Sequence, residues 1–344
     1  MIDLETKNKS FLNEYIRLAN KGIKADFLLE LKDETIKGLD PYSESLTIEQ
    51  KIRIYLEIVR NEFYFIREVV KIPVELNNET IKTDYIINSV SAKFFYTQQF
   101  PSRVFLDSVR QSGRTLMVII NSIWKSVFSE EGRMFFTISD AIVKCRGTYG
   151  KMYPEILKSL PEWLLNMSMS EKDKAEADRL VNKQYSNKNS MDIILLPGQE
   201  AKVNQFGIGF PICNWVVDSP ENNKFFQEDA VQSELFKDNN TGNKVLIVKC
   251  PKDLTTDEND KKSKFYKDLL NNSILFTDDL YMLPESIRNQ LFYGKYIHIK
   301  GDWIALGMSE AKINQEKNIL SDEEFRTNYL CEWIFKEPKP EDKN

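Results

Sequence analysis

Two kinds of hydrophobic pattern divide the chain into a helical N-terminal stretch and a longer stretch of alternating strands and helices. Apolar residues recur at helical spacing through much of residues 8–72. One of these helices opens with Thr47 and Gln50, which have the spacing of a capping box. Because Pro73 interrupts the pattern, we expect residues 1–78 to form an N-terminal helical region.

Beyond this region the pattern changes to short apolar runs separated by helical segments. Residues 77–80 predict a loop. Strands are predicted over residues 104–109, 134–138, 191–196, 213–218 and 245–249, and helices over residues 85–95, 116–128, 149–160, 222–236 and 261–270. Such alternation predicts an α/β fold with a mostly parallel sheet covered by helices. We expect this core to span residues 79–335, with a polar surface insertion over residues 168–190 and a disordered tail over residues 336–344.

A short polar loop between the first of these strands and its helix is the strongest chemical signal in the chain. Its residues are Arg110, Gln111, Ser112, Gly113, Arg114 and Thr115. Strand, tight loop and helix form the layout of a phosphate-binding loop, in which backbone N–H groups and the helix dipole meet an anion. Arg110 or Arg114 would supply positive charge, and the Thr115 hydroxyl would reach Mg²⁺. The usual motif carries Lys where Arg114 stands, so a plain polar turn remains the alternative.

A metal-binding phosphate site also needs an acidic residue at the end of a neighbouring strand. Asp218 ends a long apolar run, whereas the competing acids in residues 274–279 follow a short one. We prefer Asp218, because a longer strand places it better at the carboxyl edge of the sheet. A water-activating Glu is expected directly after this Asp, but Ser219 follows, so Glu221 serves only if the turn folds back. An Asp followed by Ser-Pro is also a common helix N-cap.

The composition narrows the classes of function. With 29% charged and 42% hydrophobic residues, the chain has the make-up of an ordinary soluble globular protein. Its net charge of −5 does not imply a basic surface. Any contact with nucleic acid would therefore depend on local basic patches or on a partner protein. Four widely spaced cysteines predict buried thiols, and a lone His298 excludes His-based triads and zinc sites. No apolar run approaches the length of a membrane span.

The order of these motifs resembles that of the large terminase subunit of tailed phages, the ATPase that drives DNA into capsids. Residues 103–115 are similar to the family's strand and Arg-Gln-x-Gly-Lys-Thr loop, and residues 206–218 to its approach to the Walker B aspartate. Similar segments in the family's order are residues 60–72, 156–165, 244–251, 264–266 and 322–333. The resemblance covers roughly residues 60–335 and implies a P-loop NTPase fold of the RecA-like type, with ATP and Mg²⁺ as cofactors.

The resemblance also implies roles for individual residues. Catalysis would involve Arg110, Arg114 and Glu221. The residues that would contact the nucleotide are Gln111, Ser112, Gly113, Arg114, Thr115 and Tyr85. Thr115 and Asp218 would hold Mg²⁺, and Cys250 and Pro251 fall at the coupling motif. Four positions depart from the family: Arg114 replaces Lys, Ser219 replaces Glu, Ile86 replaces the adenine-contacting Gln, and Cys250-Pro251 replaces a Thr-rich stretch. Gln98 and Gln99 lie near the missing Gln in sequence.

Three hypotheses about function follow. The first is a packaging ATPase in the cytoplasm of the infected bacterial host. It would act on double-stranded DNA with a portal protein and a small terminase subunit or a nuclease-bearing partner, in a homo-oligomeric ring and away from any membrane. The family continues into a nuclease domain beyond the position of Asn344, so we expect this chain to be either the ATPase part of a longer or split protein or a relative without a nuclease. The second is a catalytically impaired scaffold that binds portal, DNA or a partner ATPase. The third is a helicase-like enzyme, but the chain shows no helicase sequence motif apart from the phosphate-binding loop.

Overall fold

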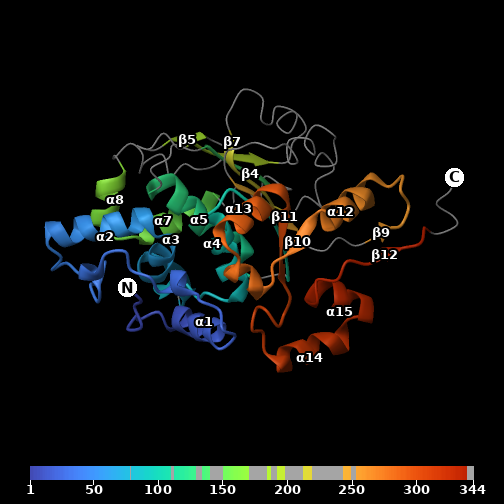
Figure 1. Ribbon diagram of the computed structural model, residues 1–344, viewed down its shortest axis with the longest axis horizontal. Helices are drawn as coiled ribbons and strands as arrows, with labels where there is room; N and C mark the ends of the chain where they lie inside the picture. Colours follow the sequence, from blue (N-terminus) through green and yellow to red (C-terminus); the bar gives the residue numbers. More distant parts are fainter. Residues whose placement is uncertain are drawn as a thin grey trace.

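A central eight-stranded sheet carries the fold in the computed structural model (Figure 1). The structure describes residues 1–77, 79–109, 112–128, 134–139, 150–169, 184–186, 192–197, 212–218, 243–248 and 253–338. The strands are β1 (Lys71–Leu76), β2 (Glu79–Asp84), β3 (Arg103–Ser108), β4 (Met134–Ser139), β5 (Gln184–Ser186), β6 (Asp192–Pro197), β7 (Ile212–Asp218), β8 (Asn243–Val248), β9 (Leu254–Thr255), β10 (Ser273–Leu275), β11 (Tyr296–Gly301) and β12 (Phe335–Lys336). The order in the central sheet is β10-β11-β3-β8-β7-β4-β6-β5, and only β5 runs antiparallel to its neighbour.

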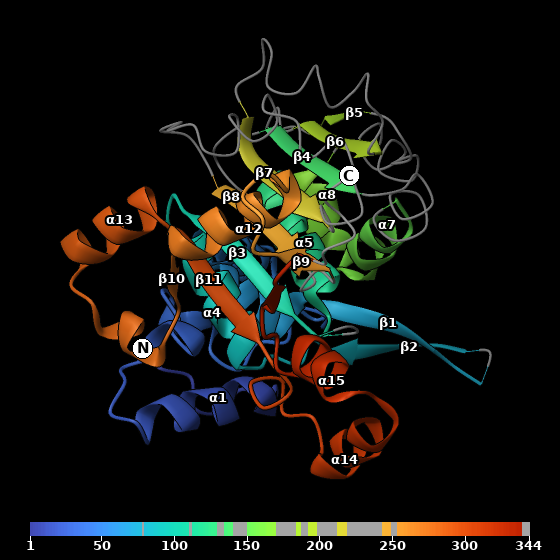
Figure 2. The same cartoon turned by 90° about the vertical axis from the view of Figure 1, so that its right-hand side faces the viewer.

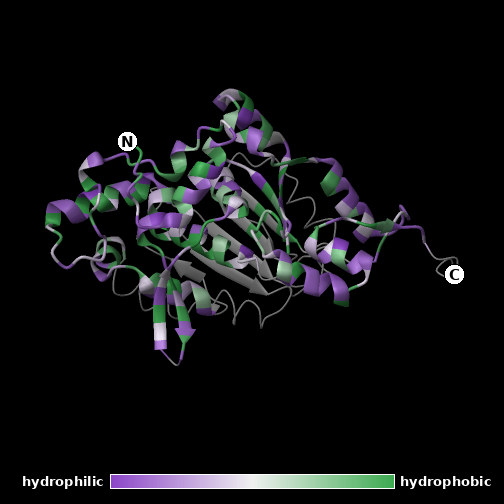
Figure 3. Ribbon diagram, turned by 90° about the horizontal axis from the view of Figure 1, so that it is seen from below, coloured by the Kyte–Doolittle hydropathy of each residue, from purple (hydrophilic) through white to green (hydrophobic). Residues whose placement is uncertain are grey.

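Helices lie around this sheet, and most of them carry both hydrophilic and hydrophobic residues (Figure 3). They are α1 (Lys9–Ala19), α2 (Ile48–Arg60), α3 (Glu62–Tyr64), α4 (Ser89–Gln98), α5 (Arg114–Ile123), α7 (Gly150–Ser159), α8 (Glu162–Ser168), α12 (Lys261–Asn271), α13 (Glu285–Gly294), α14 (Glu310–Ile319) and α15 (Asp322–Tyr329). Short helical turns are η1 (Asp26–Leu28), η2 (Glu34–Ile36), η3 (Phe65–Val69), η4 (Trp124–Phe128) and η8 (Asp278–Met282). Within the described part of the chain, no helix combines the length and apolar character that a membrane crossing requires.

The alternating pattern predicted most of the sheet correctly. The five predicted strands correspond to β3, β4, β6, β7 and β8, with ends that differ by one or two residues. The pattern missed β10 and β11. In β11 (Tyr296–Gly301), His298 and Lys300 lie among the apolar residues, so the strand has no continuous apolar run. The helix predicted over residues 222–236 and most of the polar stretch 168–190 lie outside the described residues.

The N-terminal prediction was correct for the start of α2, but residues 27–38 form only the short turns η1 and η2, and the end of the region is not helical. In α2 both hydrogen bonds of the capping box between Thr47 and Gln50 are present. Residues 71–84, however, form an antiparallel hairpin of β1 and β2 instead of the expected helix end and loop. This hairpin stands away from the body of the molecule (Figure 2). Pro73 is tolerated there because no other strand of the described residues pairs with β1 or β2. The helix predicted from residue 85 begins at Ser89, because Asn88 caps it.

The strand before the phosphate loop, β3, packs differently on its two faces. Val104 and Leu106 lie in the large hydrophobic cluster that includes α4 and α5. Phe105 points to the other face, where its ring stacks on His298 at 4.5 Å and meets the edge of Trp333 at 5.6 Å between ring centroids. Apolar contacts therefore hold β3 from both sides, which fixes the position of the loop that follows it.

A buried polar contact ties the helix after the loop to the N-terminal region. Asn121 of α5 donates a 2.7 Å hydrogen bond to Oε1 of Glu62 in α3. Burial raises the pKa of the Glu62 carboxyl to about 7, although the charge of Lys125 and the bond from Asn121 oppose this shift. The buried carboxyl is therefore held protonated up to a higher pH than an exposed one.

We expect this carboxyl to make folding stability depend on pH near neutrality. Because the folded-state pKa of Glu62 is raised, its stabilising contribution is complete below about pH 4.5 and is lost as the pH rises through about 7. Relative to the wild type, Glu62→Gln should therefore gain about 1–3 kcal/mol in free energy of unfolding between pH 5 and pH 8. Chemical denaturation at both pH values measures this, with the exposed Glu49→Gln as control. A difference that does not change with pH would contradict the prediction.

Candidate nucleotide-binding site

The loop after β3 has the backbone conformation of an anion-binding turn. Gly113 adopts φ = +76°, in the left-handed region, and is the N-cap residue of α5. Gly113 has no side chain that could cap this helix, and no cap bond is seen among the described residues, so the N–H groups of the first turn face the loop. An uncapped N-terminus of a ten-residue helix presents both N–H donors and the positive end of the dipole to an anion.

Ser112 adds a second sign that this loop is built for a ligand. Its Oγ is buried, and no hydrogen-bond partner for it is present among the described residues. A buried hydroxyl without a partner costs about 1–3 kcal/mol, which a bound acceptor would recover. The residue types and the geometry of the loop therefore fit a phosphate group.

Arg114, which stands where the phosphate-loop lysine is expected, folds back onto the sheet. Its Nη1 donates to the carbonyl oxygen of Ser108 at 3.1 Å and to that of Val248 at 3.0 Å. These carbonyls end β3 and β8, so the guanidinium bridges two adjacent strands directly below the loop. Both bonds use Nη1, and a guanidinium has further N–H donors on Nη2 and Nε with which to meet an anion.

The strand order brings the predicted metal-binding positions to one edge of the sheet. Asp107 of β3 lies opposite Val248, and Asp218 of β7 lies opposite Ile247, so the parallel strands β3, β8 and β7 end at nearly the same level. Two strand spacings separate β3 from β7, or about 10 Å. Thr115 is half-buried in the first turn of α5, at the same edge.

The competing acid after β10 is already committed elsewhere. Asp278 pairs with Arg17 at 2.9 Å and with Lys21 at 2.6 Å, and Lys93 lies at 3.5 Å. Burial alone would raise the pKa of Asp278, but the hydrogen bonds from Arg17 and Lys21 and the charge of Lys93 lower it. This carboxylate holds α1 and α4 to the turn η8, which favours Asp218 as the metal-site acid.

Several predicted site residues lie outside the described residues. They are Arg110, Gln111, Glu221, Cys250 and Pro251. Their roles in catalysis, nucleotide contact and coupling therefore stay predictions.

Tyr85, the predicted adenine contact, is a core residue. It is 5% exposed, and its ring packs edge-on against Phe95. A nucleobase cannot stack on this ring while it is covered, so the geometry argues against the predicted contact. Gln98 does not replace the missing amide either, because it is buried at the C-terminal end of α4 and accepts a bond from Lys125.

The structure also assembles a buried polar cluster that the sequence did not indicate. Asp107 is fully buried, and its Oδ2 accepts a 2.7 Å hydrogen bond from Nε1 of Trp333. Nε2 of His298 lies 3.9 Å from the same oxygen. The one signal in the sequence was an isolated acid inside the apolar run before the loop. Its partners lie 191 and 226 residues further along the chain, so only the fold brings the three side chains together.

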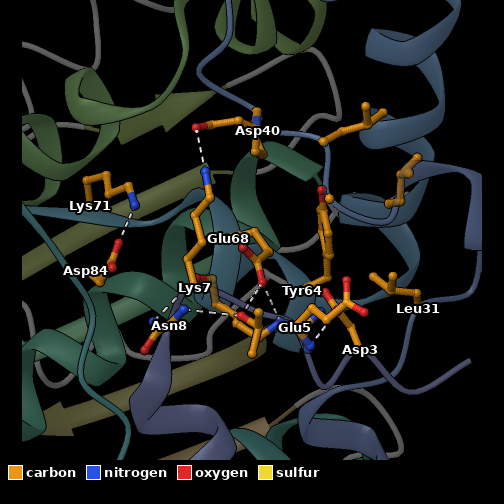
Figure 4. Close-up of a pocket in the computed structure, with 16 residues that line it drawn as sticks. Asp3, Glu5, Lys7, Asn8, Leu31, Asp40, Tyr64, Glu68, Lys71 and Asp84 are labelled. Atoms are coloured by element: carbon orange, nitrogen blue, oxygen red, sulfur yellow. Dashed lines mark hydrogen bonds and ion pairs between the residues drawn. The ribbon is translucent and has the colours of Figure 1, made fainter.

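A small hollow in the N-terminal region is not the phosphate site (Figure 4). Its volume is about 100 Å³, and Arg67 lies among its lining residues, bonded to Glu68 and to the Leu28 carbonyl. Five acidic and three basic side chains line it: Asp3, Glu5, Asp40, Glu68 and Asp84, with Lys7, Arg67 and Lys71. An excess of carboxylates disfavours phosphate, so the edge of the sheet remains the better candidate.

The sheet and loop together define the class of fold. One strand, β8, lies between the loop strand β3 and the acidic strand β7, and β11 flanks β3 on the other side. With the strands parallel and the loop leading into α5, this is the arrangement of P-loop NTPases of the RecA-like type, as the alternating pattern and the motif order predicted.

Comparison with known proteins finds similar chains among solved structures. No family model matches the chain, and no curated protein does. Among solved structures, the large terminase of a thermophilic bacteriophage in complex with ADP is similar, with 12% identity, a TM-score of 0.45, and coverage of 72% of this chain and 54% of that chain. The large terminase ATPase domain of Thermus phage P74-26 has 13% identity, a TM-score of 0.43, and coverage of 70% and 98%.

These structures belong to the family that the sequence motifs resemble. The chain matches about half of the length of the ADP-bound large terminase and nearly all of the P74-26 ATPase domain. At such low identity and TM-score the likeness is no argument about activity. What the chain does must be argued from its own loop, strand order and motifs.

The conformation of Gly113 can be tested by substitution. An added Cβ would meet no atom within 4 Å, so a larger residue here suffers from backbone strain alone. We expect Gly113→Ala to lower the free energy of unfolding by about 1–2 kcal/mol. Gly113→Asn should cost less, because Asn tolerates the left-handed region. Thermal denaturation of both variants measures the difference, and equal stability of the Ala variant and the wild type would show that the loop relaxes.

Proposed function

We propose that this chain is a terminase-like ATPase domain, which hydrolyses ATP with Mg²⁺ and couples the reaction to DNA translocation into a capsid. The observation that carries the proposal is the shared edge of β3, β8 and β7. There the uncapped N-terminus of α5 and the strand-ending Asp218 lie about two strand spacings apart. At such an edge the phosphates of a nucleotide can bind to the loop, and a metal ion can bind between the phosphates and Asp218.

Each residue of this edge has a proposed task. The amides of Ser112 and Gly113 bind phosphate oxygens, and Arg114 places its positive charge against them. Thr115 and Asp218 are the residues that would hold Mg²⁺, which neutralises charge on the phosphates when bound. Arg110 and Glu221 are proposed as the catalytic arginine and base, and Cys250 with Pro251 as the coupling segment, from the motif order alone.

The link to DNA packaging rests on the order of sequence motifs over residues 60–335. On that basis the proposed partners are double-stranded DNA, a portal protein, a small terminase subunit or a nuclease-bearing partner, and further copies of this chain in a ring. The host-cell cytoplasm is the corresponding proposed location. Because the chain covers about half of a full large terminase, the nuclease activity of such a protein is not part of the proposal.

A second candidate function is a nucleotide-binding scaffold with little turnover. The observation that favours it is the double hydrogen bond of Arg114 to strand carbonyls, since Nη1 is then already used and fewer N–H donors remain for a phosphate. Loss of a positioned base costs about 10²–10⁴ in rate, so the Ser219 and Arg114 departures could leave binding intact while hydrolysis fails.

Substitutions at two positions, Asp218 and Arg114, separate the proposals. Under the ATPase proposal, Asp218→Asn should lower Mg-dependent phosphate release at least about 100-fold, because the metal loses its protein carboxylate. Arg114→Lys should retain activity within about tenfold, whereas Arg114→Ala should lose most nucleotide affinity. Phosphate release is measured with and without DNA, and the exposed Asp322→Asn in α15 is the matched control. If the wild-type protein releases phosphate no faster than buffer alone but still binds nucleotide, the ATPase proposal fails and the scaffold proposal stands.

A further inference from the structure

The segment of residues 330–336, which we call the strap, follows α15 and packs on the face of β3 that carries Phe105 and Asp107. The ring of Trp333 meets the edge of the Phe105 ring at 5.6 Å and lies 5.3 Å from the ring of Tyr266 in α12, measured between ring centroids. At the end of the strap, β12 pairs in parallel with β9 (Figure 1). Aromatic packing and strand pairing therefore hold the strap on the sheet.

Three features of the same place oppose this docking. The Asp107 side chain is fully buried, yet only its Oδ2 has a donor, Nε1 of Trp333, and Oδ1 has no hydrogen-bond partner among the described residues. Nε2 of His298, 3.9 Å from Oδ2, also lacks a hydrogen bond there. Cys331 adopts φ = +48°, a left-handed conformation that strains a residue with a side chain. Departure of the strap would hydrate the two polar groups and relieve this strain, so docking is a balance of opposing terms.

The strap contacts the residues that lead into the phosphate loop. Trp333 holds the side chain of Asp107, and Sγ of Cys331 lies 3.7 Å from the Gly301 carbonyl oxygen. The same carbonyl accepts a 3.1 Å hydrogen bond from the N–H of Val109, the residue that follows β3. One side chain and one shared carbonyl therefore connect the strap to the last turn of chain before the loop.

We propose that Trp333 is a positioning residue for the phosphate loop, and that docking of the strap regulates anion binding there. Docked, the strap fixes the residues on either side of Ser108, whose carbonyl accepts the 3.1 Å bond from Arg114 below the loop. Undocked, the end of β3 loses this support and the loop binds phosphate more weakly. Because such coupling is reciprocal, an anion in the loop strengthens docking of the strap. The inference rests on the proposed function, because it concerns the same site.

Two measurements on the full chain test this role. Titration calorimetry with Mg²⁺ and inorganic tripolyphosphate reports on the loop, and hydrogen exchange followed by mass spectrometry reports on the Thr256 amide, which donates to the Lys336 carbonyl at 2.8 Å. Trp333→Phe keeps an aromatic ring but removes the N–H. We expect exchange at Thr256 to become at least about tenfold faster and tripolyphosphate to bind about three- to tenfold more weakly. In the wild type, bound tripolyphosphate should slow the same exchange.

A rescue and a control separate positioning from a general loss of stability. Asp107→Asn added to Trp333→Phe leaves a neutral amide where a buried carboxylate had lost its donor, so both readouts should return to within about threefold of the wild type. Trp163→Phe is the matched control, because Nε1 of Trp163 donates a 2.9 Å hydrogen bond to the Pro41 carbonyl in the N-terminal region. It should change neither readout. Melting temperatures establish that all variants are folded.

The two possible failures are distinguishable. If Trp333→Phe changes neither readout, if Trp163→Phe changes both equally, or if Asp107→Asn rescues nothing, the positioning role is overturned while wild-type binding of tripolyphosphate upholds the phosphate loop. If the wild-type chain binds neither tripolyphosphate nor a non-hydrolysable ATP analogue with Mg²⁺, the proposed function is overturned, and the positioning role with it.

Discussion

Parallel pairing of β3 with β8, and of β8 with β7, is the constraint on which the candidate site depends. Each pairing fixes which residues stand opposite one another, and together they bring the loop after β3 level with Asp218. A shift of one residue in either register would turn the buried side chains of that strand to the wrong face. Arg114 adds a direct link, because its guanidinium bonds to the carbonyls that end β3 and β8. The stability of the sheet is therefore also what holds the geometry of the phosphate edge.

The N-terminal region contributes to the site by holding the helices behind it. Glu62 fixes α5 through Asn121. The Asp278 carboxylate gathers Arg17, Lys21 and Lys93 from α1, the turn after it and α4. Since α4 and α5 both have their N-termini at the carboxyl edge, these contacts position the segments that would surround a nucleotide. The N-terminal region thus has a structural connection to the loop, even though it supplies none of the predicted metal-binding residues.

The C-terminal segment approaches the same strand from the other face. Trp333 bonds to Asp107 just before the loop, and β12 pairs in parallel with β9, which follows the end of β8. Cys331, buried as the cysteine pattern predicted, lies 3.7 Å from the Gly301 carbonyl. These contacts place the end of the described chain against β3 and the end of β11. They explain why an acid as buried as Asp107 is accommodated: its carboxylate receives an indole N–H instead of facing apolar atoms alone.

Local chemistry was enough for the sequence to determine the fold class, the five main strands, the capping box at Thr47 and the tight loop between β3 and α5. Each of these depends on residues within a few positions of one another, so periodicity and conformational preference reveal them. The tertiary structure alone decided the strand order, the packing of Tyr85 into the core, the ion pairs that occupy Asp278, and the meeting of Asp107, His298 and Trp333. These features join residues far apart in the chain, and no local pattern encodes which distant side chains the pairing of parallel strands brings together.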